Sequence, residues 1–574
     1  MKFAHSPLLS QLVPGWRGRF VLLLLLAGFA ALIARSAFLQ TINHDYLQQE
    51  GESRYSRVVE LSATRGRIVD RHGEILAIST PVKSVFAMLR GVSLTPAQTR
   101  ELARVLGMDV RELTQKLSAE RGFVFVKRQI PPDVADRVAA MNLPGIHQQA
   151  EYRRYYPVGD VASHVVGFTG TEDIGQEGME LAFDRQLAGK PGSRRVIQDR
   201  LGRIVEDVES IRAPVDGRDV VLSIDNRLQY LAHAALKQAI AEHRAKAGGV
   251  VVLDVQTGEI LALANLPGYN PNSRVKLAGA QLRNRAFTDT FEPGSTLKPF
   301  TIAMALDKGR FRSETVVDTR PGRLTIGNAT ISDAHPHGLL TVAQVIQKSS
   351  NVGAAKIAAT LAAQEMWQTF DAVGFGTAPR LGFPGEVGGR LRPYRTWKPI
   401  EQATMSYGHG ISVSLIQLAR AYLVFARDGD LPQLSLARLD AAPDEGRRVF
   451  SERTAREVRA MLEMAVLPGG TAPKAQIPGY RVAGKTGTSH KLEGGVYADR
   501  YVSSFVGFAP VSAPRLIVAV MIDEPSAGQH YGGAVAAPVF AQLMAGALRA
   551  QGIAPDAPLK PVQVAGLQEV REGD

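Results

Sequence analysis

The first long apolar stretch of the chain lies close to its N-terminus. Residues 20–39 (FVLLLLLAGFAALIARSAFL) contain Arg35 as their one charged residue. About twenty residues of helix rise roughly 30 Å, which is the thickness of the hydrocarbon core of a bilayer. Lys2, Arg17 and Arg19 precede this stretch, so the positive-inside rule predicts a cytoplasmic N-terminus and an extracytoplasmic body.

Two other interpretations of this stretch fit less well. A cleaved signal peptide would explain the basic start, but the stretch is long and no clear small-residue cleavage site closes it. A buried helix of a soluble protein would need a polar face, and the consecutive leucines at 22–26 leave none. We therefore expect residues 1–19 to be cytoplasmic and residues 20–39 to form a single transmembrane helix.

Residues 40–213 show short and mixed patterns. Thr95 before Pro96 predicts a capped helix, and Asp109 with Glu112 predicts a capping box for the next helix. Strand patterns flank these helices at 56–61, 66–69 and 123–127. We expect this region to form an elongated, mixed α/β pedestal that is not catalytic.

Residues 214–550 carry longer strand and helix patterns. The apolar stretches 248–253 and 260–264 flank a Gln-Thr-Gly-Glu turn, which predicts a hairpin. Helix and strand patterns follow at 296–306, 341–361, 414–427, 479–488, 502–509, 516–523 and 538–548. This order predicts an α+β domain in which helices cover an antiparallel sheet. Residues 551–574, with prolines and charges, are typical of a tail.

The composition indicates a folded protein with a basic surface. Of the 574 residues, 45% are apolar and 21% are charged, so the chain can bury hydrophobic cores. The net charge of +12 and the isoelectric point near 9.7 favour an anionic partner, such as a membrane face or an acidic polymer. The sequence has no run of five basic residues, so we do not expect nucleic acid to be the partner. The absence of cysteine excludes disulfides, a cysteine nucleophile and thiolate metal sites.

Three short motifs carry the candidate chemistry. Ser295 follows a Pro-Gly turn at the start of a predicted helix, and Lys298 lies three residues later on the same helical face. Taken alone, this pair fits a capping serine beside a solvated lysine better than a catalytic pair. Ser349-Ser350-Asn351 and Lys485-Thr486-Gly487-Thr488 follow, at a helical pattern and in a strand pattern. The three motifs in this order are the signature of penicillin-binding proteins and class A β-lactamases.

The chemistry assigns a role to each polar residue of these motifs. A serine hydroxyl is a weak nucleophile, so Ser295 needs a base, and Lys298 can be that base only when it is uncharged. The positive charge of Lys485 would lower the pKa of Lys298. Ser349 can pass a proton, and the Asn351 amide can bind a substrate amide and hold Lys298 in place.

The strand motif predicts how the substrate is held. Side chains alternate along a strand, so Thr486 and Thr488 share one face and can bind a substrate carboxylate. Gly487 would let the substrate backbone approach closely. The backbone N–H groups of Ser295 and Thr488 are candidates for the oxyanion hole.

Further motifs make nearly the whole chain similar to class B penicillin-binding proteins. In the pedestal the resemblance depends on motifs that β-lactamases would lack, at 65–73 (RGRIVDRHG), 154–157 (RYYP), 162–167 (ASHVVG) and 175–180 (GQEGME). In the predicted catalytic domain, three segments resemble the division-specific members: 291–295 (FEPGS), 349–353 (SSNVG) and 523–525 (DEP). The elongation-specific members would carry aspartate at the position of Asn351.

The resemblance implies a D,D-transpeptidase that cross-links septal peptidoglycan stem peptides through a serine acyl-enzyme and is inhibited by β-lactams. It also implies a single-pass inner-membrane protein whose catalytic domain is periplasmic and which works beside a glycosyltransferase in the divisome. The family uses no metal and no organic cofactor. Its transpeptidase fold is the helix-covered antiparallel sheet predicted above.

The aromatic residues near the predicted site follow the family pattern only in part. Tyr501 and Tyr531 resemble the aromatic wall near the β-lactam side chain, although ordinary packing would explain them equally well. His530 stands where an aromatic hydrocarbon is expected. After Thr488, division members usually continue with alanine and a basic pair, whereas this chain has Ser-His-Lys with His490 in the middle.

Other functions fit parts of the same pattern. The chain could be an elongation-type transpeptidase, or a D,D-carboxypeptidase or β-lactamase in which water is the acceptor. It could also be a non-catalytic, β-lactam-binding scaffold of the divisome. A β-lactam sensor would need a signalling domain, and residues 1–19 are too few to form one.

Overall fold

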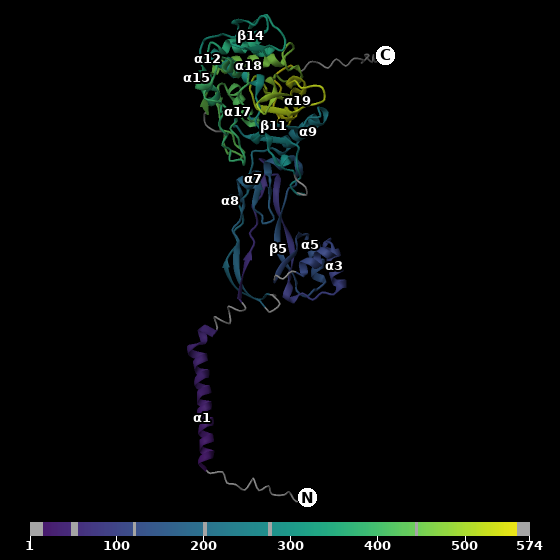
Figure 1. Ribbon diagram of the computed structural model, residues 1–574, viewed down its shortest axis with the longest axis vertical. Helices are drawn as coiled ribbons and strands as arrows, with labels where there is room; N and C mark the ends of the chain where they lie inside the picture. The colour runs from purple at the N-terminus through teal and green to yellow at the C-terminus, as the bar shows by residue number, and fades with distance from the viewer. Residues whose placement is uncertain are drawn as a thin grey trace, which may run out of the picture. The chain divides into compact units, whose positions relative to one another are not determined.

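The computed structural model describes residues 15–47, 56–118, 122–198, 204–273, 278–441 and 446–558 (Figure 1). The chain forms two compact units, each assembled from separate segments. Unit 1 comprises Met1–Ala63, Lys83–Glu151 and Lys190–Val215, and unit 2 comprises Thr64–Val82, Tyr152–Gly189 and Asp216–Asp574.

The apolar N-terminal stretch is helical. Helix α1 spans Gly15–Ala37 and continues into the π-helical turn η2 (Phe38–Ile42), and none of their residues is buried. This continuous helix is long and apolar enough to cross a membrane. Helix α19 (Gly532–Ala550) also passes that test, but half of its most apolar window is buried in the core of unit 2. The predicted anchor therefore corresponds to α1.

In unit 1, helices pack on a small sheet. Strand β4 (Phe123–Ile130) pairs antiparallel with the second half of β3 (Ile75–Met88). Apolar side chains from these strands and from the helices form one core. The helices are α3 (Pro96–Leu106), α4 (Val110–Leu117) and α5 (Pro132–Ala140), and β5 (Ile146–Tyr155) begins in this unit. A second, antiparallel sheet has the order β1 (Ser56–Leu61), β8 (Gly192–Gln198), β9 (Ile204–Arg212).

Of the two helix caps predicted in unit 1, the first is present in full and the second only in part. Thr95 and Gln98 form the reciprocal bonds of a capping box at the start of α3. Asp109 caps α4 by accepting from the backbone N–H groups of residues 111 and 112. The prediction that Glu112 completes a capping box is wrong, because its carboxylate pairs with Lys116 at 2.9 Å, one turn further along the helix.

The pedestal motifs that lie in unit 2 assemble around a buried ion cluster. Glu180 accepts from the Nε atoms of Arg65 at 2.7 Å and Arg154 at 2.6 Å, and all three side chains are at most 2% exposed. Arg65 also pairs with Asp184 at 2.8 Å. The surrounding elements are short: β2 (Ile68–Val69), η4 (Gly159–Ala162), α6 (Ser163–Val166), β6 (Phe168–Thr169), β7 (Gly175–Glu177), α7 (Gly178–Ala182), α8 (Asp184–Leu187) and β10 (Val220–Val221).

The centre of unit 2 is a five-stranded sheet in the order β12-β11-β21-β20-β19, in which all neighbours are antiparallel. The strands are β11 (Ala247–Asp254), β12 (Ile260–Leu266), β19 (Ala483–Glu493), β20 (Val496–Ala509) and β21 (Leu516–Asp523). Because alternate side chains face opposite sides, Val250 and Val252 lie in one core, and Val251 and Leu253 lie in another. The predicted α+β class, with helices over an antiparallel sheet, is confirmed.

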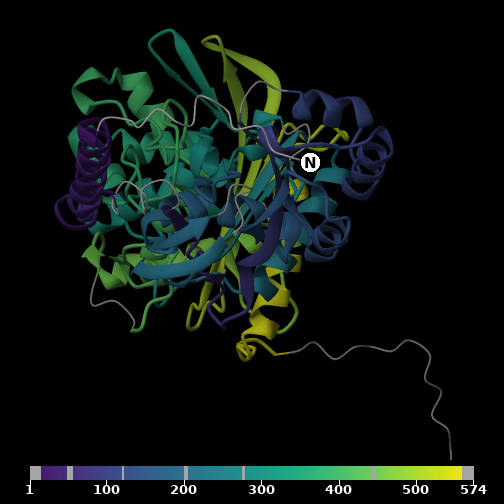
Figure 2. The same cartoon turned by 90° about the horizontal axis from the view of Figure 1, so that it is seen from below.

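Each face of this sheet is covered by helices. Helices α9 (Asn226–Glu242) and α19 pack on one face, and α17 (Leu415–Ala426) packs on the other, so that β11 lies between them (Figure 1). In Figure 2 the hairpin of β19 and β20, drawn in yellow-green, projects from the edge of the unit. The other elements are α10 (Gly279–Leu282), α11 (Arg285–Thr288), η5 (Gly294–Leu297), α12 (Lys298–Asp307), β13 (Val316–Asp318), β14 (Arg323–Ile326), β15 (Ala329–Ser332), β16 (Leu339–Thr341), α13 (Val342–Lys348), α14 (Asn351–Ala358), α15 (Ala363–Ala372), η6 (Tyr394–Thr396), α16 (Pro399–Met405), β17 (Asp430–Leu431), β18 (Arg447–Arg448), α18 (Glu452–Val466) and η7 (Pro473–Ala475).

Candidate active site

Ser295 lies in the short 3₁₀ helix η5, directly before α12 and beside the edge strand β19. Gly294 has a positive φ of 56°, and a Cβ atom built on it would lie 3.2 Å from the carbonyl oxygen of Thr488. The close approach therefore favours glycine at this position. Lys298 is the first residue of α12, so the helical turn brings its side chain back toward Ser295.

Lys298 is the centre of the site. Its Nζ atom lies 2.6 Å from Ser295 Oγ, 2.8 Å from the carbonyl oxygen of Ser349, 3.2 Å from Ser349 Oγ and 2.8 Å from Asn351 Oδ1. The carbonyl oxygen and Oδ1 can only accept, so they match the two N–H bonds of an uncharged amine. The lone pair of the Lys298 Nζ atom is then available for the proton of the Ser295 hydroxyl. The predicted contacts of Lys298 with Ser295 and Asn351 are present.

The surroundings favour the uncharged form of Lys298. Burial lowers its pKa well below the usual lysine value, and the charge of Lys485 lowers that pKa further, while Asp333 opposes both effects. Burial also lowers the pKa of Lys485 to about 7. Lys485 Nζ donates to the carbonyl oxygen of Thr486 at 3.3 Å, on its own strand, so it acts on Lys298 through its charge.

The predicted helix over 341–361 is interrupted at the second motif. Helix α13 ends at Lys348 and α14 begins at Asn351, because Ser349 adopts a left-handed conformation with a φ of 61°. Such a conformation in a residue other than glycine costs on the order of 1–3 kcal/mol and occurs often at functional sites. The break turns both the carbonyl and the hydroxyl of Ser349 toward Lys298.

Asp333, which follows β15, holds the start of α14 in place. Its Oδ1 accepts from the backbone N–H groups of Asn351 at 2.5 Å and Val352 at 2.9 Å, and its Oδ2 accepts from Ser350 Oγ at 2.7 Å. Asn351 Nδ2 donates to the Ser332 carbonyl oxygen at 2.9 Å, which leaves Oδ1 facing Lys298. Sequence reasoning missed Asp333, because no local motif marks it.

On β19, Thr486 and Thr488 lie as the alternation predicts. Thr486 Oγ1 bonds to Thr471 Oγ1 at 3.2 Å, and Thr488 Oγ1 accepts from the N–H of Gly532 at 3.0 Å. At Gly487 an added Cβ would lie 2.8 Å from the carbonyl oxygen of residue 293 and 2.3 Å from the hydroxyl of residue 504. Gly487 is therefore needed for η5 and β20 to pack against β19, a reason the sequence did not reveal.

The aromatic residues form a row beside β19. The rings of His490 and Tyr501 are 4.4 Å apart, those of Tyr501 and His530 stack at 3.9 Å, and those of His530 and Tyr531 are 4.5 Å apart. Tyr531 is 59% exposed, and it precedes Gly532, whose N–H bonds to Thr488. The two histidines that depart from the family pattern thus lie in the row with both tyrosines.

The site also contains neutral groups that sequence reasoning missed. Lys298 Nζ lies 5.8 Å from the centre of the Tyr407 ring, which packs against His409. Burial, together with Lys298 and His490, lowers the pKa of His409 to about 4, so its imidazole is neutral at pH 7. Within the described ranges, no group of three His, Asp or Glu side chains is arranged to hold a metal ion.

In this site a serine hydroxyl lies beside a buried amine whose surroundings favour its uncharged form, at the edge of a helix-covered antiparallel sheet. These features define a serine acyltransferase of the penicillin-recognising class. The chain matches the family model "Penicillin binding protein transpeptidase domain" over residues 248–545 and "Penicillin-binding Protein dimerisation domain" over residues 60–222. It belongs to the penicillin-binding protein family, as the sequence motifs predicted.

Similar proteins are known from several bacteria. The chain is 45% identical over 551 residues to the "Probable peptidoglycan D,D-transpeptidase PenA" of Neisseria gonorrhoeae, covering 95% of this chain and 94% of that protein. It is 42% identical over 551 residues to the "Peptidoglycan D,D-transpeptidase FtsI" of Escherichia coli K12, covering 94% and 93%. Among solved structures, the transpeptidase domain of Burkholderia pseudomallei penicillin-binding protein 3 is 50% identical with a TM-score of 0.55, covering 59% of this chain and 98% of that one.

A second solved structure has a different title. It is named as a peptidoglycan glycosyltransferase from Burkholderia ambifaria, is 48% identical to this chain and has a TM-score of 0.54. The match covers 59% of this chain and 100% of that one.

Proposed function

We propose that this protein is a septal peptidoglycan D,D-transpeptidase that cross-links stem peptides through an acyl-enzyme on Ser295. The observation that carries the proposal is the 2.6 Å contact between the buried Nζ atom of Lys298 and the Oγ atom of Ser295. An amine that burial keeps uncharged can take the hydroxyl proton as the oxygen attacks. The names of the relatives, D,D-transpeptidases PenA and FtsI, support the reaction and the role in division.

The reaction proceeds in two acyl transfers. Ser295 Oγ bonds to the penultimate D-alanine carbonyl carbon, Lys298 takes the hydroxyl proton, and the N–H groups of Ser295 and Thr488 stabilise the oxyanion. The C–N bond then breaks, and the terminal D-alanine leaves with a proton passed through Ser349. An amine of a neighbouring stem attacks the ester, its proton returns to Ser295 Oγ, and the cross-link is formed.

The remaining candidate residues bind the donor stem. Thr486 and Thr488 hold its terminal carboxylate, with the charge of Lys485 nearby, and the Asn351 amide binds a substrate amide. Tyr501 and Tyr531 line the entrance, where β-lactam side chains also lie. Neither a metal nor an organic cofactor takes part in this reaction.

Mass spectrometry tests the nucleophile directly. After incubation with a penicillin, the full chain in detergent is expected to gain the mass of the opened drug on the peptide containing Ser295. The Ser295→Ala variant is expected to gain none, and Ser118→Ala, which changes an exposed serine of unit 1, is expected to react as the parent does. Absence of an adduct would favour the scaffold function, and loss of the adduct within seconds would favour a β-lactamase.

The cellular role is tested by replacing the chromosomal gene with the Ser295→Ala form. Such cells are expected to fail in septal cross-linking and to grow as filaments, while the variant protein stays in the membrane. Rounded cells would instead indicate an elongation-type enzyme, and normal division would contradict the proposed catalytic role.

The proposed location follows from α1 and the charges before it. We assign residues 1–19 to the cytoplasm, 20–39 to the inner membrane, 40–213 to a pedestal, 214–550 to a periplasmic transpeptidase domain and 551–574 to a tail. The divisome partners would include a glycosyltransferase, whose new glycan strands supply the stems. A reporter active only in the periplasm is expected to work when fused to the C-terminus of the chain and to fail when fused to its N-terminus.

A further inference from the structure

Acylation of Ser295 places a positive charge inside the protein. When the hydroxyl proton moves to Lys298, the O–H bond of Ser295 breaks, an N–H bond forms at Nζ, and the uncharged amine becomes an ammonium ion. Lys298 is fully buried, so water does not solvate this ion. The groups around Nζ must stabilise it instead, and each group that does so contributes to the rate of acylation.

The charged groups that act on Lys298 have opposite signs. Lys485, on β19, repels the ammonium form, and Asp333, which follows β15, attracts it. The repulsion is the larger of the two effects, so these charges together disfavour the ammonium form. His409, from the segment between α16 and α17, is neutral at pH 7 and adds no charge of its own.

The ring of Tyr407 supplies an attraction that these charges do not. Lys298 Nζ lies over the face of this ring, 5.8 Å from its centre, and an aromatic face attracts a cation within about 6 Å. Tyr407 is only 6% exposed, so little water weakens the attraction. Burial also raises the pKa of the Tyr407 hydroxyl, which therefore stays uncharged. The ring can thus act on the amine through its π face.

The backbone on both sides of Tyr407 is fixed to the elements that carry the nucleophile and its base. Before the ring, the carbonyl oxygen of Ser406 accepts from Thr301 Oγ1 of α12 at 3.0 Å. After the ring, the carbonyl oxygen of Gly408 accepts from the N–H of Gly294 at 3.3 Å. Gly408 has a φ of 90°, and an added Cβ would lie 2.2 Å from the Gly294 carbonyl oxygen. The ring is therefore in position before the reaction begins.

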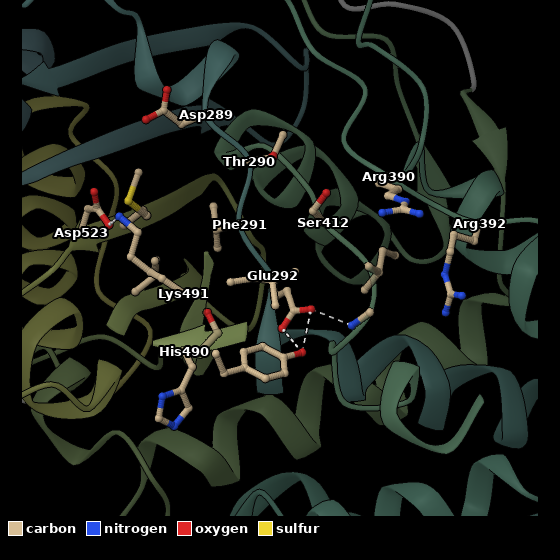
Figure 3. A pocket seen from close by; sticks show the side chains of 17 residues that line it. Asp289, Thr290, Phe291, Glu292, Arg390, Arg392, Ser412, His490, Lys491 and Asp523 are labelled. Carbon is tan, nitrogen blue, oxygen red and sulfur yellow. Dashed lines mark hydrogen bonds and ion pairs between the residues drawn. The ribbon is translucent and has the colours of Figure 1, made fainter. Parts of the chain in front are cut away.

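The same segment continues into the wall of the cavity beside the nucleophile. There the N–H of Gly410 donates to the Glu292 carboxylate at 2.8 Å, which a dashed line marks in Figure 3. Phe291 and Val413 exchange two backbone hydrogen bonds of 3.0 Å. These contacts hold residues 406–413 against the turn that carries the nucleophile, so the ring and the reacting atoms keep their distance.

We propose that the face of the Tyr407 ring binds the ammonium group that Lys298 becomes as it takes the Ser295 proton, and thereby stabilises the transition state of acylation. This inference rests on the proposed acyl transfer and deepens it, because it adds a residue outside the three motifs to the groups that act on the reacting nitrogen. The attraction grows only as the charge forms, so it accelerates the chemical step and does not strengthen the binding of the donor.

Fluorinated rings at position 407 test the proposal while the shape of the side chain is kept. Phenylalanine and its mono-, di- and trifluorinated forms replace Tyr407 in the full chain in detergent, and the second-order rate of acylation by a fluorescent penicillin is followed between pH 5 and 9. Each fluorine withdraws negative charge from the ring face, so the attraction for a cation falls stepwise.

The expected result is a graded loss of rate with a change in pH dependence. Tyr407→Phe keeps the ring face and is expected to stay within about threefold of the parent. The trifluorinated ring is expected to lower the plateau rate about tenfold relative to Tyr407→Phe. The rise of the rate with pH should also move about one unit lower, because the ammonium form of Lys298 loses stabilisation.

Two controls separate the charge of the ring from its packing. The same fluorinated series at Phe370, a buried ring of α15, is expected to leave the rate and its pH dependence unchanged. Tyr407→Leu removes the ring and is expected to lower the plateau and to move the rise to lower pH, as the trifluorinated ring does.

A rate that does not change along the fluorinated series at position 407 would overturn the proposal. A loss with Tyr407→Phe as large as with Tyr407→Leu would assign the effect to the hydroxyl and would also overturn it. So would a lower plateau without the move to lower pH, which would indicate a packing defect. Penicillin acylation of the parent at Ser295 separates the two claims. If an adduct forms and the series is flat, the inference fails alone; if no adduct forms, the proposed function fails.

Discussion

Replacing Asp333 by asparagine is expected to slow acylation of Ser295 without removing any group that touches the substrate. The carboxylate accepts three hydrogen bonds from the start of α14, the segment that places Asn351 against Lys298. An asparagine side chain has one oxygen acceptor and no charge, so at least one of these bonds is lost and the others become weaker.

The magnitude follows from these bonds. Hydrogen bonds to charged groups contribute about 1.5–3 kcal/mol and neutral ones about 1 kcal/mol, so the start of α14 loses roughly 2–4 kcal/mol. If half of this loss reaches the transition state, the acylation rate falls about five- to thirtyfold. The loss of the Asp333 charge also has an effect on the pKa of Lys298, and this effect favours acylation. Asp333 raises the pKa of Lys298, so its removal lowers that pKa, and the uncharged base persists to lower pH.

The assay is the second-order rate of acylation by a fluorescent penicillin between pH 5 and 9. The rate is expected to rise with pH as Lys298 loses its proton, and in Asp333→Asn this rise should move to lower pH while the plateau falls. Asp318→Asn, the same exchange at an exposed position of β13, is the control and should match the parent. A rise that moves to higher pH, or an unchanged plateau, would refute the reasoning.

Two further changes test other parts of the structure. Glu180→Gln leaves the buried guanidinium of Arg154 without a carboxylate and is expected to lower the free energy of unfolding by about 3–5 kcal/mol. The midpoint of thermal inactivation should fall by more than about 5 °C, and an unchanged midpoint would contradict this expectation. Gly487→Ala places a methyl group 2.8 Å from the Pro293 carbonyl oxygen and pushes η5 away from β19. Acylation is expected to slow by about a hundredfold while the circular dichroism spectrum stays unchanged, and a rate within threefold of the parent would show that η5 can adapt.

The sequence predicts those parts of the site that local geometry decides. Three residues of helix are enough to bring Lys298 to Ser295, and alternation along β19 is enough to put Thr486 and Thr488 on one face. The contact of Asn351 with Lys298 was expected because an amide oxygen suits an amine, and the structure gives it as 2.8 Å.

What the sequence did not reveal depends on residues that meet only in the folded chain. Asp333 follows the hairpin of β14 and β15 and reaches a helix eighteen residues further on, with no motif to mark the contact. The sequence predicts one helix over 341–361 because nothing in its composition forbids a helix there. In the structure, the left-handed conformation of Ser349 divides this helix in two. Strand β3 (Ile75–Met88) is not among the strands predicted from the sequence, and it runs through Pro81, which has no backbone N–H to donate.

The two buried amines have a consequence for the folding equilibrium itself. An unfolded chain carries both lysines as ammonium ions, so folding must release protons near neutral pH. With a folded pKa of about 7 against an ordinary value of 10.5, Lys485 alone opposes folding by about 4 kcal/mol at pH 7. Because the unfolded chain binds these additional protons, the native state becomes less stable as the solution is acidified from pH 10 toward pH 7. Methionine at 298 or 485 should therefore give a protein that is inactive yet harder to unfold, which would reveal how much native stability the chain gives up to keep a reactive serine.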